Sequence, residues 1–121
     1  MIYLSQTRLD EIMQLLKKVF EAKLRKVTIL SHYKTDEKEY LKVKALINHA
    51  EIEIREFLIQ NSIIYYSYSV RIGNKTEWWN NRPRHKDIET FPHHRHVNGR
   101  ILALYNHSLE SFLNYVKKIV N

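Results

Sequence analysis

The segment from residue 80 to residue 99 gathers side chains that are able to act on a phosphate ester. It holds four of the seven histidines of the chain, and Trp78 and Trp79 precede it directly. The basic residues in and beside it are His85, His93, His94, His96, Arg82, Arg84, Lys86, Arg95 and Arg100. Imidazole donates or accepts a proton near neutral pH, and guanidinium binds phosphate oxygens in pairs. Aromatic faces stack on unpaired bases, so the combination favours chemistry on RNA.

The same histidines leave a metal site open as a second interpretation. His94 and His96 are two residues apart and share a face if this stretch is extended. Two imidazoles with a carboxylate from elsewhere are able to bind zinc or another divalent ion. The chain has no HExxH or comparable spacing, so metal-independent chemistry without a cofactor is the preferred prediction. Any single histidine could equally serve packing or hydrogen bonding.

A carboxylate and a tyrosine add to the candidate chemistry. Glu56 continues the alternation of Ile52 and Ile54, so a regular strand points it toward the apolar face. Because an unpaired buried carboxylate is costly, Glu56 is expected to be paired, to end its strand, or to follow a bulge. Beside the histidines it would orient an imidazole or act as a base, and otherwise it is a solvent-exposed strand end. Tyr68, which shares a face with Tyr66, is a core residue or part of a binding platform.

Hydrophobic periodicity predicts a helix at each end of the chain and strands between them. Apolar residues recur every three or four positions over residues 9–20 and 109–119, with Thr7 and Ser108 as N-caps. Between the helices, apolar and polar residues alternate, as in strands that bury one face. The predicted strands lie around residues 27–31, 41–47, 51–55, 63–72, 75–79 and 101–105.

The short connections between consecutive strands predict an antiparallel arrangement. The expected fold class is α+β, with an antiparallel sheet of about five or six strands and an N-terminal and a C-terminal helix packed on one face. Leu16 and Phe112 should then face the same side of the sheet, and the other face should remain open as a binding platform. The segment 80–99 has no clear period and is predicted to be a long functional loop.

Composition and charge bound the class of protein. A chain of 121 residues corresponds to one domain, 1–121, and it has no cysteine for a disulfide, a thiolate zinc site or a nucleophile. The net charge of +7 favours a polyanionic partner such as nucleic acid, or it simply aids solubility. No apolar run is long enough to cross a bilayer, and the N-terminus lacks a signal-peptide pattern. We therefore expect a cytoplasmic protein without a membrane partner.

The second half of the chain carries a specific series of short motifs. The series begins with Glu56-Phe57 and Tyr66-Ser67-Tyr68 and continues in two longer runs. These runs are Trp79-Asn80-Asn81-Arg82-Pro83-Arg84-His85 and Thr90-Phe91-Pro92-His93-His94-Arg95-His96-Val97. In order and spacing they resemble the TumE-type toxins of toxin–antitoxin pairs, although members often carry Asp in place of Asn80 and His in place of Arg84. The resemblance implies a small toxin that cleaves RNA and is neutralised by a helix-turn-helix antitoxin encoded beside it.

The leading hypothesis is therefore a metal-independent endoribonuclease toxin of a type II toxin–antitoxin pair. A base deprotonates the ribose 2′-hydroxyl, an acid protonates the leaving 5′-oxygen, and cations stabilise the charge on the phosphoryl oxygens. The predicted acid and base are His94 and His96, with His85 and Glu56 assisting. The predicted substrate-binding residues are Arg82, Arg84, Arg95, Trp79 and Tyr68, and Trp78 is the alternative stacking residue.

Three other interpretations stay open. A non-catalytic nucleic-acid-binding domain would use the same basic and aromatic surface. A protein-interaction module would fold its loop against an antitoxin. A metal-dependent nuclease would lose activity when a chelator is added. In each case a homodimer formed through an edge strand is also possible.

Overall fold

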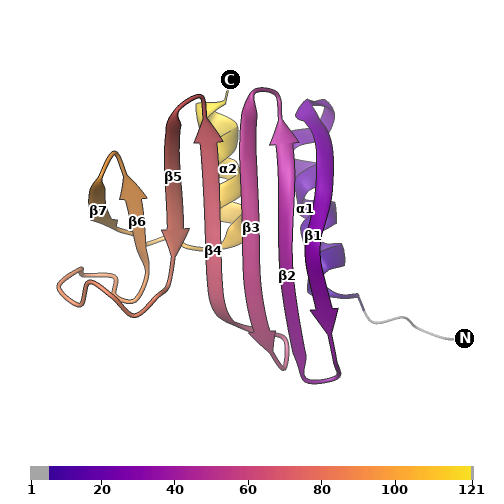
Figure 1. Cartoon of the computed structure of the whole chain (residues 1–121), viewed down its shortest axis with the longest axis horizontal. Coiled ribbons are helices and arrows are strands. Elements are labelled where there is room, and N and C mark those ends of the chain that lie inside the picture. The colour runs from indigo at the N-terminus through magenta and orange to yellow at the C-terminus, as the bar shows by residue number, and fades with distance from the viewer. Residues whose placement is uncertain (1–5, 121) are drawn as a thin grey trace, which may run out of the picture.

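The computed structural model describes residues 6–120 and has an α+β fold (Figure 1). Seven antiparallel strands form one sheet in chain order, and both helices lie on the same face of it. The helices are α1 (Arg8–Phe20) and α2 (Leu109–Ile119), and a short 3-10 helix, η1 (Glu21–Lys23), follows α1. The strands are β1 (Leu24–Lys34), β2 (Lys38–Ile47), β3 (Ala50–Ile59), β4 (Ser62–Ile72), β5 (Lys75–Asn80), β6 (His94–Val97) and β7 (Arg100–Ala103). The predicted fold class is confirmed, with one strand more than the sequence indicates.

Each helix begins after the predicted N-cap and packs against a common core. The Thr7 hydroxyl accepts a hydrogen bond from the backbone N–H of Asp10, whose carboxylate accepts one from the Thr7 N–H. The Ser108 hydroxyl accepts one from the backbone N–H three residues further on. Leu16 and Phe112 are fully buried in the same core, which confirms that both helices cover one face of the sheet.

The central strands alternate between this covered face and an open face. The apolar side chains beneath the helices are Leu41, Val43, Ala45, Ile47, Ile52, Ile54 and Val70. The intervening side chains on the open face are largely polar, and several pair across strands, such as Lys42 with Glu53 and Lys44 with Glu51. The sheet therefore separates a hydrophobic core from a polar surface that neither α1 nor α2 covers.

Three predictions about the elements need correction. β6 lies inside the segment predicted to be a loop, because its histidines and arginine give no apolar alternation to recognise. It is held as a strand by backbone pairing with β5 on one side and β7 on the other. Tyr105 lies beyond the end of β7, and Ile119, in the last turn of α2, is 41 % exposed because it lines a surface cavity and not the core.

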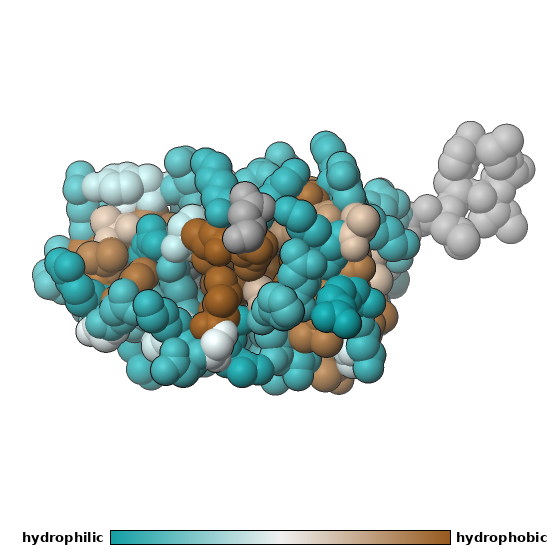
Figure 2. Space-filling view, turned by 90° about the horizontal axis from the view of Figure 1, so that it is seen from above, coloured by the Kyte–Doolittle hydropathy of each residue, from teal (hydrophilic) through white to brown (hydrophobic). Residues whose placement is uncertain are grey.

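Hydrophobic side chains gather at the end of the molecule where α2 ends (Figure 2). A cavity of about 240 Å³ opens at this end, and Val70, Ile72, Val97 and Ile119 form its apolar lining. The polar residues of the same cavity are Lys75, Thr76, Glu77 and Asn98. Within residues 6–120, no helix has both the length and the apolar character needed to cross a membrane.

Candidate active site

The pairing of β5 with β6 divides the predicted site residues between the two faces of the sheet. Trp78 lies opposite His96, and both side chains line a cavity on the open face together with His94. Trp79 lies opposite Arg95, and both side chains are on the covered face. Successive side chains of a strand point to opposite sides, so neighbours in sequence are separated by the thickness of the sheet.

Three imidazoles meet on the open face. His94 and His96 project from β6, and His85 joins them from the connection between β5 and β6, where its backbone has a φ of 61°. One ring nitrogen of each histidine lies within 4.8 Å of the corresponding nitrogens of the other two. The ring centroids are 4.9, 5.2 and 5.9 Å apart, and the ring planes are steeply inclined to one another. The three histidines predicted to act as acid, base and assisting residue therefore lie close together on one face.

Contacts behind this histidine cluster fix two of its rings. His94 is 2 % exposed, and its Nδ1 lies 2.9 Å from the carbonyl oxygen of Pro92. Because a carbonyl only accepts, Nδ1 carries a hydrogen, and in the neutral ring the lone pair is therefore on Nε2. His96 stacks on Trp78, with 4.6 Å between the ring centroids. Burial, and then the nearby rings of His94 and His85, lower the pKa of His96.

A cavity of about 380 Å³, here called the histidine cavity, opens over the cluster. Its other lining residues are Glu53, Arg55, Tyr65, Ser67, Trp78, Asn80, Arg82 and Arg84. Arg82 donates a hydrogen bond from Nε to the Tyr65 hydroxyl and lies over the Tyr65 ring. In the described part of the chain, the buried Nε of Arg55 has no hydrogen-bond partner. An anion that entered the cavity would therefore meet the side chains of three arginines, of which Arg82 and Arg84 are exposed.

The sequence analysis did not name Glu53, Arg55, Tyr65 or Ser67 as site residues, although all of them line the histidine cavity. Their signal was available in the alternation of β3 and β4, since these positions must face away from a core that takes Ile54, Tyr66 and Tyr68. The expectation that Glu56 lies beside the histidines is wrong for the same reason. The nearby carboxylate is that of Glu53, which lines the cavity from the open face.

Glu56 is fully buried on the covered face and is paired there. Its Oε1 accepts a hydrogen bond from Arg8 Nε at 2.6 Å, and its Oε2 accepts one from Arg8 Nη2 at 3.0 Å. The Tyr68 hydroxyl donates to Oε2 at 2.5 Å. Burial, and then the adjacent carboxylate, raise the pKa of Tyr68. Tyr68 is 1 % exposed. Like Glu56, it lies on the covered face and does not reach the histidine cavity.

Trp79 and Arg95 form a second paired group on the covered face. Trp79 Nε1 donates to Glu77 Oε2 at 2.8 Å, and Arg95 Nη2 lies 2.6 Å from the same oxygen. The Tyr115 hydroxyl, from α2, donates to Glu77 Oε1 at 2.5 Å. Trp79 is only 4 % exposed. These contacts tie β5 and β6 to α2 and place both predicted substrate-binding residues away from the cavity.

His93, the remaining histidine of the segment, also lies apart from the cluster. Its Nδ1 is 2.9 Å from the Tyr66 hydroxyl, and its ring stacks on His107 with 3.6 Å between centroids. Burial, and then the nearby His107 and His94 rings, lower the pKa of His93. Both rings of this pair stack on Tyr66 of β4.

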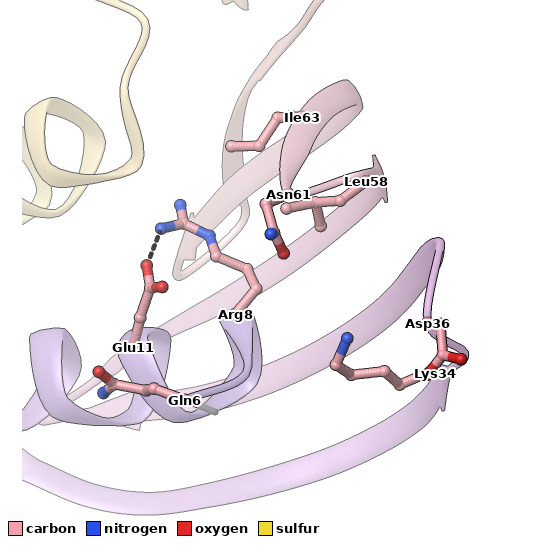
Figure 3. A pocket seen from close by; sticks show the side chains of 8 residues that line it. All are labelled: Gln6, Arg8, Glu11, Lys34, Asp36, Leu58, Asn61 and Ile63. Atoms are coloured by element: carbon pink, nitrogen blue, oxygen red, sulfur yellow. Dashed lines mark hydrogen bonds and ion pairs between the residues drawn. The ribbon is translucent and has the colours of Figure 1, made fainter. Parts of the chain in front are cut away.

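A larger cavity, of about 630 Å³, lies near the beginning of α1 (Figure 3). Arg8 points toward Glu11 there and forms an ion pair of 3.1 Å with it. Lys34 and Asp36 line the cavity from the end of β1 and the turn that follows. Its lining residues include no histidine, and its arginine is already bound to two carboxylates. We therefore assign the candidate active site to the smaller histidine cavity.

The model of the Toxin TumE family matches residues 12–120. The chain belongs to the TumE toxin family. The TumE match covers α1 from residue 12 onward, all of α2 and every residue of the histidine cavity, and it confirms the resemblance seen in the sequence. Membership indicates a toxin of a toxin–antitoxin system, with an antitoxin as its partner. Comparison with curated proteins and with solved structures gives no match.

The two positions that depart from the TumE pattern, Asn80 and Arg84, both line the histidine cavity. Asn80 is 7 % exposed, and its Oδ1 accepts a hydrogen bond from the backbone N–H of Arg82 at 3.0 Å. An aspartate oxygen at position 80 would accept the same bond, so the turn after β5 does not depend on the amide. Arg84 is exposed at the mouth of the cavity, where it adds a cation in place of an imidazole.

Proposed function

We propose that this toxin is an endoribonuclease and that its histidine cavity cleaves RNA without a metal ion. The observation that carries the proposal is the convergence of three imidazole nitrogens within 4.8 Å, in a cavity that three arginines also line. Transfer of a phosphodiester needs a proton acceptor, a proton donor and cations around one phosphate. The histidine cavity provides all three on an open face of the sheet.

In the proposed reaction, one half-buried imidazole, that of His85 or of His96, takes the proton of a ribose 2′-hydroxyl. The oxygen then forms a bond to the adjacent phosphorus, while the bond from phosphorus to the 5′-oxygen breaks. The other imidazole gives its proton to that 5′-oxygen, which leaves a 2′,3′-cyclic phosphate and a free 5′-hydroxyl. His94, predicted as acid or base, is too buried to reach RNA and acts as a positioning residue for the other two rings.

The surrounding side chains supply binding. The exposed guanidinium groups of Arg82 and Arg84 contact phosphates, and the guanidinium of Arg55, which lines the same cavity, donates a hydrogen bond to an oxygen of the reacting phosphate. Trp78 is 39 % exposed beside the cluster and takes the stacking role that the sequence left between it and Trp79. Glu56, Tyr68, Trp79 and Arg95 instead stabilise the fold.

The proposed setting is the cytoplasm, with a helix-turn-helix antitoxin as the partner. A toxin with a net charge of +7 is attracted to an acidic surface, and such a surface would compete with RNA for the same arginines. An antitoxin that covers the open face of the sheet would therefore block the histidine cavity.

The test uses single-stranded RNA, with and without methylation of its 2′-hydroxyls, in the presence of EDTA. We expect cleavage of the unmodified RNA to products with 2′,3′-cyclic phosphate ends, and binding without cleavage of the methylated RNA. Cleavage of the methylated RNA would contradict attack by the 2′-hydroxyl. Binding of both RNAs without cleavage of either, both in EDTA and with added divalent metal ions, would favour a nucleic-acid-binding module, whereas cleavage only with added metal ions would favour a metal-dependent nuclease. No binding at low salt would favour a protein-interaction module.

A further inference from the structure

The histidine cluster is also a ligand set for a metal ion. Imidazole nitrogens are preferred ligands of Zn²⁺ and of neighbouring divalent transition metals. His85, His94 and His96 each contribute one ring nitrogen, and these nitrogens surround one point within 4.8 Å of each other. Three imidazoles occupy three positions of a tetrahedral site and leave the fourth open to the cavity.

A second observation is the hydrogen bond behind His94. Its Nδ1 donates to the Pro92 carbonyl oxygen at 2.9 Å, so the free lone pair is on Nε2. Metal-binding histidines usually donate their other N–H to a carbonyl or a carboxylate, because this bond fixes the tautomer and the direction of the ring. The stack of Trp78 on His96, with 13° between the ring planes, restrains the orientation of a second ring.

The charges around the cluster affect the strength of binding. Arg55, Arg82 and Arg84 oppose a cation in the cavity, whereas the carboxylate of Glu53 favours one. Transition metals bind neutral imidazole through coordinate bonds, so selectivity for these metals does not require a net negative site. The arginines weaken the affinity and disfavour Mg²⁺ and Ca²⁺, which bind oxygen ligands.

We propose that His85, His94 and His96 bind one divalent transition metal ion, and that the bound ion stops RNA cleavage. The second part rests on the function proposed above, since a lone pair that binds a metal ion can neither accept nor deliver a proton. Zinc–nitrogen bonds of about 2.0–2.1 Å place tetrahedral ligands roughly 3.3 Å apart, so the rings close in by roughly 1–2 Å on binding. His85 is half-buried on a connection between strands, and rotation of its side chain provides this movement.

A titration with Co²⁺ tests metal binding without reference to RNA. Bound Co²⁺ absorbs visible light in a way that depends on its ligands, and it quenches the fluorescence of Trp78, whose ring lies 4.6 Å from that of His96. We expect saturation at one ion per chain. His85→Ala and His96→Ala should each weaken binding by about tenfold or more. His49→Ala, which removes an exposed histidine from the turn between β2 and β3, should bind like the unmodified protein.

The melting temperature of each variant shows that it is folded. His85 and His96 are only half-buried. Loss of Co²⁺ binding in a folded variant therefore shows that the histidine itself binds the metal ion. Binding that does not saturate at one ion per chain contradicts the site. Equal affinity in His85→Ala, His96→Ala and the unmodified protein also contradicts it.

Zinc added to the RNA assay tests whether the bound metal ion stops RNA cleavage. We expect one equivalent of Zn²⁺ to slow cleavage by about tenfold or more, and an excess of EDTA to restore the rate. If Co²⁺ binds as described but the protein does not cleave RNA, the proposed function fails and the metal site stands. If Zn²⁺ accelerates cleavage or is required for it, the inhibitory role is wrong although the ligands are right.

Discussion

Both faces of the sheet carry charged and aromatic side chains, but these side chains are paired on the covered face and converge on a cavity on the open face. On the covered face, the carboxylates of Glu56 and Glu77 each bind an arginine and a tyrosine. On the open face, three imidazoles converge on a cavity that Arg55, Arg82 and Arg84 also line. Side chains that are paired and covered stabilise the fold, whereas side chains that converge on a cavity are available to a ligand. We propose that this difference separates the residues that stabilise the protein from those that carry its function.

The largest expected effect on the covered face comes from Glu56→Ala. This change leaves the guanidinium of Arg8 and the hydroxyl of Tyr68 without their shared acceptor. Breaking a buried pair by removing one partner costs about 3–5 kcal/mol, so we expect the free energy of unfolding to fall by roughly that amount. Urea denaturation of the variant and the unmodified protein measures the difference.

Glu51→Ala is the matched control on the open face. Glu51 pairs with Lys44 and Arg71 near the surface, where an ion pair contributes only about 0–1 kcal/mol. Equal destabilisation by Glu51→Ala and Glu56→Ala would show that the two faces do not differ in the way described.

The two tryptophans offer the next comparison, because they are adjacent in sequence and face opposite sides. Trp78→Ala should weaken binding of single-stranded RNA by about 1–3 kcal/mol, the range for loss of one base-stacking residue, and leave the unfolding free energy nearly unchanged. Trp79→Ala should instead destabilise the protein by about 3–5 kcal/mol, because it removes a buried aromatic side chain. RNA titrations and urea denaturation measure both quantities, and interchanged results would place the binding surface on the covered face.

The smallest expected effect concerns the salt dependence of RNA binding. For single strands, log K falls with log salt by about 0.7 for each phosphate contacted. Removal of one contact by Arg82→Ala or Arg84→Ala should make the slope shallower by about 0.7, whereas Arg25→Ala, in β1 at the far edge of the sheet, should leave it unchanged. RNA titrations at several salt concentrations give the slopes. Equal slopes for all variants would exclude these arginines as phosphate contacts.

Much of the fold could be predicted from the sequence because its signal is local. The stripe Leu9, Ile12, Leu16, Val19 and Phe20 is the buried face of α1, and alternation gave the buried sides of β2 and β3. β6 could not be recognised, because its strand state depends on pairing with β5 and β7 and not on apolar side chains.

The site was predictable only in part, because its geometry also depends on the pairing of strands and not on local patterns. The density of histidines indicated a shared site, but without knowing that β6 is a strand, Arg95 could not be separated from His94 and His96. The alternation in β3 indicated that Glu56 is buried, but its partner Arg8 lies 48 residues earlier in the chain. A pairing over that distance depends on how α1 packs across the sheet, which no local pattern records.

The most direct test of the histidine cavity is the rate at which the His85→Ala/His96→Ala double variant cleaves single-stranded RNA. General acid–base catalysis contributes about 10²–10⁴-fold, so we expect cleavage at least about a hundredfold slower than that of the unmodified protein and of His49→Ala. RNA binding and melting temperature should change little, because neither imidazole is fully buried. A folded double variant that cleaves RNA at the unmodified rate would contradict the assignment of the histidine cavity as the active site.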